Sequence, residues 1–386
     1  MKQRLIYILK HNTVLQKIYK VCMSLVFRFL GIFIPTDENL VLMSSFMGSN
    51  FNDSPKVIYE SVRSNPQYNN LKFVWAFEHP EKFPELKSVK IDTFKYFVTA
   101  LKAKYWITNT NIERGLSFKK KRTIYLNTWH GIALKKIGND CPGRKDYNFN
   151  SVDYLCVSGE HDENVFRSAF NAVELSYLKC GMPRNDRLWN AVDAERIEMR
   201  KKLGIAEGKK IILYAPTWRD STDGGRSYEI KPPINFDKWK DELGEEYIVL
   251  FRAHHITTKV LDVCFDEFIK DASQYPDVND LMIASDLLIT DYSAIAFDYS
   301  ILCKPILCYA YDYDTYLADR GTYFDMDERY PNKSCRTEDE LLTKIKNINA
   351  EQECEKTQKF RDEFISHGRT ATETCVRALF EKRKQL

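Results

Sequence analysis

A histidine, two arginines, a second histidine and a serine follow short apolar segments at separate places in the sequence. They are His130, Arg219, the pair Arg252 and His254, and Ser293. Guanidinium groups bind phosphate oxygens in bidentate fashion, and a neutral imidazole can accept a proton near neutral pH. Each has a plainer interpretation, since Arg252 could pair with an acid and a lone histidine after a strand is usually a hydrogen-bonded loop residue. Together, the set suits a diphosphate ligand.

The segment around Ser293 predicts a strand, a polar turn, a helix and a second strand. Residues 287–290 are apolar, the helix is expected to open at Ser293, and a second buried strand is expected after Pro305. Unpaired backbone N–H groups at the start of a helix attract anions. The turn is therefore a candidate phosphate cradle, although a serine in this position more often simply caps the helix.

These residues must be positioned by strands, and the rest of the sequence supplies them in alternation with helices. Strands are expected at residues 40–46, 71–77, 105–108, 123–127, 153–157 and 174–178, and helices at 54–62, 94–103 and 161–170. After a charged helix at 194–203, strands are expected at 210–214, 247–251, 286–290 and 305–309. Such alternation predicts mainly parallel sheets covered on both faces, in two α/β domains with a boundary near residues 185–195. Ligands of such folds bind at the carboxyl ends of the strands.

The bulk composition is that of a globular chain. Its 386 residues, 44% of them hydrophobic, can fill two cores, which favours two domains. The formal net charge of +3 is nearly balanced and argues against a nucleic-acid-binding protein. The ten cysteines lack metal-binding spacing, and several, such as Cys156, Cys303 and Cys308, lie in apolar segments. We therefore expect reduced, buried thiols in a cytoplasmic protein, with neither a metal nor a cofactor.

The first 35 residues form a separate basic segment, because several lysines and arginines precede the first acidic residue, Asp37. Residues 13–30 have helical periodicity, with an apolar stripe and an opposite polar stripe: Leu15, Ile18, Cys22, Leu25 and Phe29, against Lys17, Lys20, Ser24 and Arg28. The apolar runs are too short for a confident membrane span, and no cleavage site closes a signal peptide. The helix suits the surface of an anionic membrane, and the alternative is a helix docked on its own domain.

Six segments, in order between about residues 40 and 330, resemble those of the CDP-glycerol glycerophosphotransferase family, the teichoic-acid and capsule polymerases and primases of bacteria. They are 45–48 with 53–55, 129–131 with 134–138, 181–186, 215–219, 252–254 and 290–293. The resemblance implies a GT-B fold of two Rossmann-like domains. After the basic, membrane-associating segment at 1–35, we therefore expect a Rossmann-like acceptor domain at 36–190 and a Rossmann-like nucleotide-donor domain with the C-terminal helices at 191–386.

The resemblance also implies roles for single residues. By matching motif positions, His130 corresponds to the proposed catalytic base and His254 to a second essential histidine near the diphosphate. Arg219, Arg252, Asp291 and Ser293 match positions that look like donor-binding ones. The family often has a second serine after the Ser293 position, where this chain has Ala294, so one hydroxyl is missing.

The activity implied is transfer of a polyol phosphate, most directly glycerol phosphate, from a CDP-polyol to a hydroxyl of a lipid-linked acceptor. CMP is released, and the product is a teichoic acid or capsular polymer. The acceptor hydroxyl must lose its proton as it attacks phosphorus, which His130 could accept, while arginines and the turn at Ser293 stabilise the leaving charge. We expect that no metal is required, because side chains and the start of the helix can neutralise this charge.

The implied location is the cytoplasmic face of the cell membrane, with peripheral attachment to an anionic surface. Two other functions remain open at this point. A GT-B glycosyltransferase using a nucleotide sugar would share the fold and the cationic cleft. A non-catalytic nucleotide- or polymer-binding protein of the cell envelope is the alternative outside enzymes.

Overall fold

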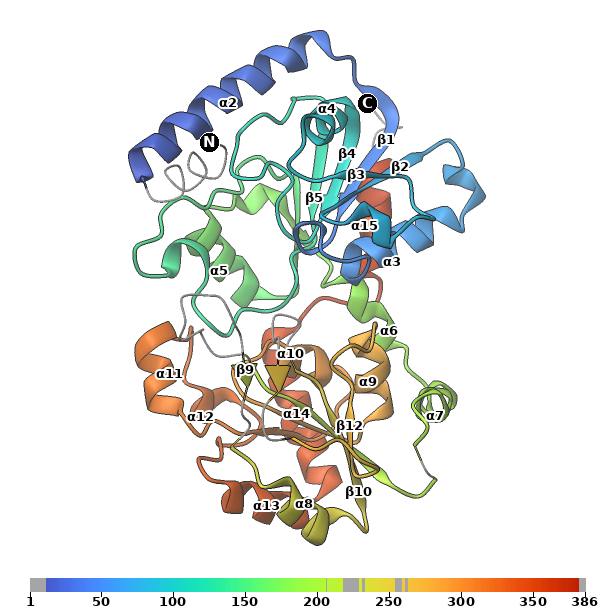
Figure 1. Ribbon diagram of the computed structural model, residues 1–386, viewed down its shortest axis with the longest axis vertical. Coiled ribbons are helices and arrows are strands. Elements are labelled where there is room, and N and C mark those ends of the chain that lie inside the picture. The colour runs from blue at the N-terminus through green and yellow to red at the C-terminus, as the bar shows by residue number, and fades with distance from the viewer. Residues whose placement is uncertain are drawn as a thin grey trace.

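Two parallel sheets carry the fold of the computed structural model, which describes residues 12–205, 207–217, 229–230, 233–253, 259–260 and 263–381. Figure 1 shows them as two α/β units, one above the other in this view. The first sheet has seven strands in the order β3-β2-β1-β4-β5-β6-β7, and the second has five in the order β12-β10-β8-β13-β14. All pairings within both sheets are parallel, which confirms the predicted α/β architecture.

The first unit follows the predicted alternation closely. Its strands are β1 (Asp37–Ser44), β2 (Lys72–Phe77), β3 (Ser88–Lys90), β4 (Ala103–Thr108), β5 (Ile124–Asn127), β6 (Tyr154–Val157) and β7 (Tyr177–Lys179). Its main helices are α3 (Asp53–Arg63), α4 (Phe94–Lys102) and α5 (Glu160–Phe170). Two details differ from expectation: β3 was not predicted, and the strand expected at 174–178 begins only at Tyr177, after a 3-10 turn.

The second unit contains the strands β8 (Lys210–Ala215), β10 (Tyr247–Phe251), β12 (Ile269–Asp271), β13 (Leu287–Thr290) and β14 (Ile306–Cys308). The two-residue strands β9 (Glu229–Ile230) and β11 (Lys259–Val260) pair separately. Its helices are α6 (Asp186–Trp189), α7 (Asp193–Lys202), α8 (Phe236–Leu243), α9 (Val278–Ala284), α10 (Ile295–Ser300), α11 (Tyr313–Arg320), α12 (Met326–Arg329), α13 (Glu338–Lys346) and α14 (Ala350–Phe364). The strand–turn–helix–strand unit around Ser293 is confirmed, but its helix begins at Ile295.

Both sheets reverse their strand order beside their first strand. In the first sheet the chain moves from β1 to β2 and β3 on one side and returns to β4 on the other; in the second it moves from β8 to β10 and β12 and returns to β13. Such reversal points open a crevice at the carboxyl ends of the strands, where ligands of doubly wound folds bind. The fold thus offers two crevices, one after β1 and β4 and one after β8 and β13.

The last helix crosses back to the first unit. α15 (Ala371–Phe380) contributes Ala371, Cys375 and Leu379 to the core cluster that also contains Ile58 of α3 and Cys156 of β6. Figure 1 shows α15 in red beside the strands of the first unit. In the sequence, the last strand of the first sheet ends before residue 190 and the first strand of the second begins after residue 191. The predicted domain boundary between residues 190 and 191 stays a prediction.

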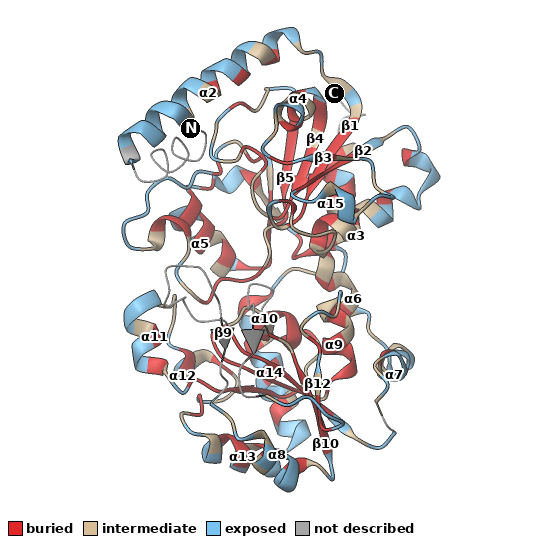
Figure 2. Cartoon of the chain, viewed as in Figure 1, coloured by how far each residue is buried: buried red, intermediate tan, exposed pale blue. Residues whose placement is uncertain are grey.

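Both faces of each sheet are covered, so inner strands such as β5, β10 and β13 are entirely buried (Figure 2). The first sheet packs between one cluster that includes Trp106 and Phe166 and another that includes Trp75 and Ile58. Among the cysteines singled out from the sequence, Cys156 and Cys308 are buried and Cys303 is partly buried. A sheet covered on both faces leaves the loops at its strand ends as the places where binding residues are most often found.

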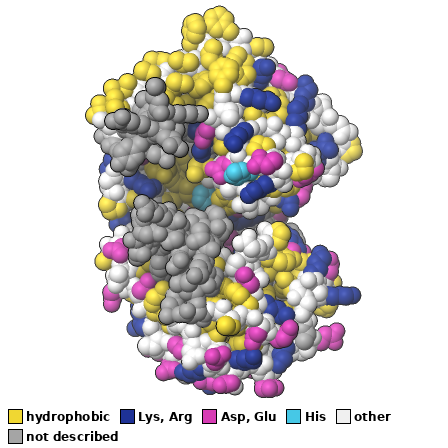
Figure 3. Space-filling view, viewed as in Figure 1, with side chains coloured by type: hydrophobic (Ala, Val, Ile, Leu, Met, Phe, Trp, Pro, Cys, Tyr) yellow, Lys and Arg dark blue, Asp and Glu magenta, His cyan; other side chains and the backbone are white. Residues whose placement is uncertain are grey.

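The N-terminal helix α2 (Thr13–Phe33) packs on the first unit through one narrow face. Phe27, only 3% exposed, stacks on Phe97 of α4 with ring centroids 4.4 Å apart. The predicted apolar stripe faces outward, with Leu25 58% and Phe29 61% exposed. Figure 3 shows hydrophobic side chains gathered over this end of the molecule. Among the described residues, no helix has the combined length and apolar character needed to cross a membrane.

Candidate active site

His130 lies in the loop that follows β5, in the crevice of the first sheet. Its neighbours bend the loop sharply, with φ +51 at Trp129 and φ +151 at Gly131. The ring is partly buried and its Nδ1 lies 2.7 Å from the carbonyl oxygen of Asn109, the residue that directly follows β4. The Asn109 side chain in turn accepts a hydrogen bond of 2.8 Å from the backbone N–H of Phe46. Asn109 therefore links the loop after β1, through Phe46, to His130 in the loop after β5.

The contacts of His130 fix the tautomer of its neutral ring. A carbonyl oxygen can only accept, so Nδ1 carries the proton in the bond to Asn109, and Nε2 is then the basic nitrogen. Aromatic rings hold the imidazole from two sides: Trp129 at 4.1 Å and Phe46 at 5.5 Å between ring centroids. An imidazole held in this way is prepared to accept a proton at Nε2.

In the second sheet, Asp291 organises the crevice between β8 and β13. Its Oδ1 accepts the backbone N–H of Thr217 at 2.8 Å and that of Tyr292 at 2.7 Å. The hydroxyl of Thr290 donates to the carbonyl oxygen of Ala215 at 2.7 Å, so the two strand ends are joined twice. Asp291 is buried, only 2% exposed, and holds the loop after β8 against the turn that carries Ser293. The Ser293 hydroxyl accepts a long bond of 3.4 Å from Ile295 N–H at the start of α10.

The two crevices meet at Gly131 and Ala294. A Cβ atom placed on Gly131 would lie 3.0 Å from the Cβ of Ala294 and 3.7 Å from Nη2 of Arg184. The loop with His130 thus touches the turn next to Ser293. Among the residues proposed from the sequence, the structure brings together His130, Asp291 and Ser293.

Arg184, in the segment that connects the two units, joins both sides of this site. Its Nη1 donates to Asp53 at 2.6 Å and to the carbonyl oxygen of His130 at 3.0 Å, and its Nη2 donates to Asp298 of α10 at 2.8 Å. All three side chains are nearly buried: Arg184 is 11% exposed, Asp53 7% and Asp298 8%. We call Asp53, Arg184 and Asp298 the clasp. Two further amides complete it, because Asn185 donates to Asp298 at 2.7 Å and Asn279 donates to the Arg184 carbonyl oxygen at 2.7 Å.

The charges of the clasp stabilise one another against burial. Burial by itself would lower the pKa of Arg184, but Asp298 and Asp53 outweigh it and hold that pKa above its usual value. Burial likewise opposes ionisation of Asp53, yet Arg184 and the Ser54 N–H lower its pKa overall. The clasp is therefore an ionised network, in which loss of one member leaves a buried charge unpaired.

Arg252 directly follows β10, two strands away from β13. Its Nη1 donates to the carbonyl oxygens of Ala272 and Tyr275, both at 2.9 Å, which anchors the loop after β12. Burial lowers its pKa. Arg219 and His254, also proposed from the sequence, lie outside the described residues.

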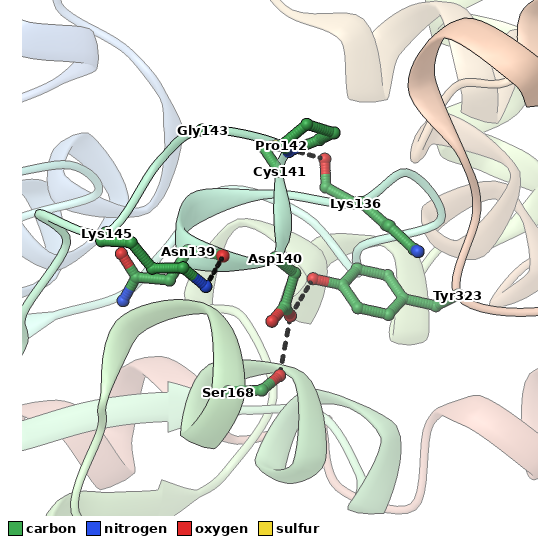
Figure 4. Close-up of a pocket in the computed structure, with 9 residues that line it drawn as sticks. All are labelled: Lys136, Asn139, Asp140, Cys141, Pro142, Gly143, Lys145, Ser168 and Tyr323. Atoms are coloured by element: carbon green, nitrogen blue, oxygen red, sulfur yellow. Dashed lines mark hydrogen bonds between the residues drawn. The ribbon is translucent and has the colours of Figure 1, made fainter.

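A second contact between the units lies beside the site. Backbone bonds join Lys136 N–H to Gly321 at 3.2 Å and Tyr323 N–H to Leu134 at 2.9 Å. Figure 4 shows the hydroxyls of Tyr323 and Ser168 pointing at the Asp140 carboxylate, each 2.7 Å away. Burial and the neighbouring Asp140 raise the pKa of Tyr323. These bonds surround an open cavity of about 550 Å³ and hold the loop that follows His130 against the second unit.

Sequence reasoning missed the clasp. Asp53 and Arg184 lie in segments that carry the family resemblance, but neither follows a strand in the way that His130 does. The bond between Arg184 and Asp53 spans 131 residues of sequence, and that between Arg184 and Asp298 spans 114. The local sequence signal was Gly181, three residues before Arg184, because an isolated glycine indicates an unusual backbone conformation. The structure explains this glycine by its φ of +77 and its close approach to His367.

Known proteins share sequence with most of this chain. The model of the family described as CDP-Glycerol:Poly(glycerophosphate) glycerophosphotransferase matches residues 26–381. The chain is 31% identical over 378 residues to the teichoic acid poly(glycerol phosphate) polymerase of Bacillus spizizenii, covering 92% of this chain and 94% of that protein. It is 37% identical over 351 residues to the polymerase of the same name from Staphylococcus epidermidis, covering 84% of this chain but only 48% of that protein.

Solved structures show the same relationship. The wall teichoic acid polymerase TagF superposes with a TM-score of 0.81 at 32% identity, over 92% of each chain. A variant of TagF soaked with CDPG gives a TM-score of 0.80 at the same identity, also over 92% of each chain. The two-unit architecture is thus GT-B-like, as predicted, and the chain belongs to the CDP-glycerol:poly(glycerophosphate) glycerophosphotransferase family.

Proposed function

We propose that this protein transfers a polyol phosphate, most directly glycerol phosphate, from a CDP-polyol to a hydroxyl of a membrane-linked acceptor. CMP is the second product, and the reaction belongs to teichoic acid or capsular polymer synthesis. The first domain presents the acceptor and the second holds the nucleotide. Membership of the glycerophosphotransferase family supports the class of reaction.

The observation that carries the proposal is the contact between the loop after β5 and the turn after β13. Gly131 lies against Ala294, so His130 and Ser293 flank one site at the reversal points of both sheets. An in-line displacement needs a base for the attacking hydroxyl on one side of the phosphorus and positive charge for the leaving group on the other. Two facing crevices provide these two sides.

On the acceptor side, His130 is the catalytic base. Its Nδ1–H donates to Asn109, so Nε2 carries the lone pair that takes the proton of the acceptor hydroxyl. As the proton leaves, the hydroxyl oxygen forms a bond to the phosphorus that bears the polyol. The bond from that phosphorus to the oxygen of the CMP phosphate breaks, and CMP departs with the electron pair. General bases placed in this way contribute about 10²- to 10⁴-fold to a rate.

On the donor side, Ser293, Arg252, Arg219 and His254 stabilise the charge that develops on CMP. Asp291 is a positioning residue, because its Oδ1 already accepts two backbone N–H groups and fixes the loop that leads towards Arg219. Arg252 likewise uses Nη1 to hold the loop after β12, which leaves the rest of its guanidinium for the nucleotide. Removal of one donor to a developing oxyanion typically costs about 3 to 4 kcal/mol of barrier.

Peripheral attachment to the cytoplasmic face of the membrane is supported by α2. A helix on a soluble domain normally buries its apolar stripe, whereas here Leu25 and Phe29 face outward and Ser24 of the polar stripe is buried against the protein. Lys20 pairs with Asp146 at 3.2 Å, and Ser24 accepts the Ser117 N–H at 3.0 Å. An outward apolar stripe of this kind enters the headgroup region of a bilayer.

The test is CMP release in the presence of a lipid-linked acceptor, with CDP-glycerol, CDP-ribitol and a nucleotide sugar as separate donors. We expect release of CMP from a CDP-polyol, and its dependence on the acceptor. Transfer only from the nucleotide sugar would instead establish the glycosyltransferase function. Binding of the donors without turnover of any would overturn the enzymatic proposal.

A further inference from the structure

The cavity beneath α2 has a composition that the transfer reaction itself does not explain. It has a volume of about 730 Å³ and lies between α2, residues 111–117 and residues 146–151. The helix contributes Lys20, Ser24 and Arg28 of its polar stripe, together with Val21 and Leu25. Because Val21 and Leu25 are also 59% and 58% exposed, one rim of the cavity continues into the outward apolar surface.

Among the described residues, one cation of the cavity, Arg28, has no acid paired with it. Lys20 pairs with Asp146, and Arg114 pairs with Asp92 at 2.7 Å. Arg28 instead donates to the carbonyl oxygen and the hydroxyl of Ser117, both at 2.7 Å, and its Nη1 has no partner within the described part of the chain. A guanidinium bound only to neutral groups keeps its full charge for an anion, and its planar fork matches a phosphate.

Two acids line the cavity, and both already have partners: Asp146 pairs with Lys20, and Glu113 is bound by its own loop. Glu113 accepts the backbone N–H groups of Phe118 and Lys119, at 2.7 and 3.0 Å, and the Ser151 hydroxyl at 2.6 Å. Its carboxylate is therefore committed to the loop. The remaining polar lining is rich in amides and hydroxyls, which are the groups that bind sugar hydroxyls: Asn111, Ser117, Asn148, Asn150 and Ser151.

The cavity shares a wall with the candidate active site. Met47 lines it, and the preceding residue, Phe46, packs against the ring of His130. The same segment is held by the residues after β4, since Met47 N–H donates to Thr110 at 3.2 Å and Phe46 N–H donates to Asn109. A ligand in the cavity can therefore extend past Met47 towards the base.

We propose that this cavity binds the headgroup of the lipid-linked acceptor, a sugar phosphate carried on a lipid. Its phosphate pairs with Arg28, its sugar contacts the amide-rich wall, and its lipid leaves over Val21 and Leu25 onto the apolar surface of α2. The acceptor hydroxyl then extends past Met47 to His130. This assignment rests on the proposed transfer to a membrane-linked acceptor, and it adds where that acceptor is held.

The test measures CMP release at saturating CDP-glycerol while the concentration of a short-chain lipid-linked acceptor is varied in detergent micelles. We expect Arg28→Gln to raise the acceptor KM about tenfold or more, which corresponds to loss of a charge-assisted hydrogen bond. The donor KM and the slow release of CMP to water should stay unchanged. Asn150→Ala, in the segment 146–151 that lines the cavity, should raise the acceptor KM about threefold.

Arg63→Gln is the matched control, because Arg63 is an exposed arginine on α3 outside the cavity. It should leave the acceptor KM unchanged. Arg28→Lys separates charge from geometry, and we expect it to restore the KM only in part.

Two results would overturn the assignment while leaving the transfer reaction intact. In the first, Arg28→Gln transfers to the acceptor with an unchanged KM. In the second, it weakens binding to vesicles of anionic phospholipid without affecting the acceptor KM in micelles, which would make Arg28 a contact to bulk lipid. Absence of transfer by the unaltered protein would contradict the proposed function itself.

Discussion

Two arginines of this protein occupy opposite environments. Arg184 is 11% exposed and donates to two carboxylates that come from different units. Arg28 is exposed, borders an open cavity and, within the described part of the chain, donates only to the neutral oxygens of Ser117. The charge of Arg184 is thus used to hold the two crevices together, whereas that of Arg28 remains for a ligand. The two side chains are of the same type, so their different roles follow from how far each is buried and from whether its hydrogen-bond acceptors are charged.

Arg184→Gln should cause the largest change in stability. It leaves Asp53 and Asp298 as buried, unpaired charges, and we expect a loss of about 3 to 5 kcal/mol in the free energy of unfolding. Arg28→Gln is the matched variant, and it should cost about 1 kcal/mol or less, because its acceptors on Ser117 are neutral and the contact is exposed to water. Urea unfolding followed by tryptophan fluorescence measures both, and equal losses would contradict the distinction between the two arginines.

Gly131→Ala should have the next largest effect, because a Cβ there would lie 3.0 Å from Ala294 at a φ of +151. We expect a loss of about 1 to 3 kcal/mol in stability and lower transfer activity, since overpacking moves the loop with His130. Gly143→Ala is its control: Gly143 also has a positive φ, +74, but nothing within 4 Å of a Cβ. If both variants lose the same amount of stability, backbone strain explains the effect and the contact between the units contributes nothing.

A third carboxyl beside the clasp should make stability depend on pH. Asp162 is buried, its Oδ2 accepts the Ser158 N–H at 2.8 Å, and burial raises its pKa from 3.8 to about 7. Between pH 4 and 7 the folded chain holds a proton that the unfolded chain has lost, so the contribution of Asp162 becomes less favourable as pH rises. This decrease in stability with pH ends above about pH 7, where Asp162 is ionised in both states.

Asp162→Asn removes this titration while keeping an oxygen for Ser158. The variant should therefore gain melting temperature relative to the unaltered protein, by an amount that grows between pH 4 and 7 and then levels off. Thermal unfolding at half-unit pH steps measures the difference. A gain that does not change with pH would show that Asp162 is ionised throughout this range.

The smallest expected effect concerns salt. The Arg28 cavity is open to solvent, so raising NaCl from about 50 to 300 mM should raise the acceptor KM by a few-fold through screening. The buried clasp should be affected much less, so the relative stabilities of Arg184→Gln and the unaltered protein should hardly change. If the acceptor KM of Arg28→Gln responds to salt as strongly as that of the unaltered protein, the screened charge is not Arg28.

Most of the fold could be predicted from local patterns. Apolar runs such as residues 247–251 and 287–290 became the buried strands β10 and β13, because a strand covered on both faces must be apolar throughout. The unpredicted strands β3 and β12 have three residues each and lie at sheet edges, where burial imposes little pattern. The helices α8 and α9 also went unpredicted between the recognised strands.

The candidate site was predictable only where it depends on strand ends. His130, Arg252, Asp291 and Ser293 follow parallel strands, and topology alone brings such residues to one edge of a sheet. Arg184 and Asp298 meet through the packing of one unit against the other, which leaves no periodic signal. For α2, periodicity identified the apolar stripe, but only the structure shows that this stripe faces outward.

The central claim is that the loop after β5 brings a catalytic base to the donor crevice, and it is tested directly by His130→Ala. The measurement is steady-state CMP release from CDP-glycerol with a lipid-linked acceptor. His79→Ala is the control, because His79 is exposed and its ring bonds only to Glu81, at 2.9 Å, among the described residues. We predict that His130→Ala lowers kcat about 10²- to 10⁴-fold with little change in donor KM, while His79→Ala remains fully active. Undiminished turnover by folded His130→Ala would contradict the claim.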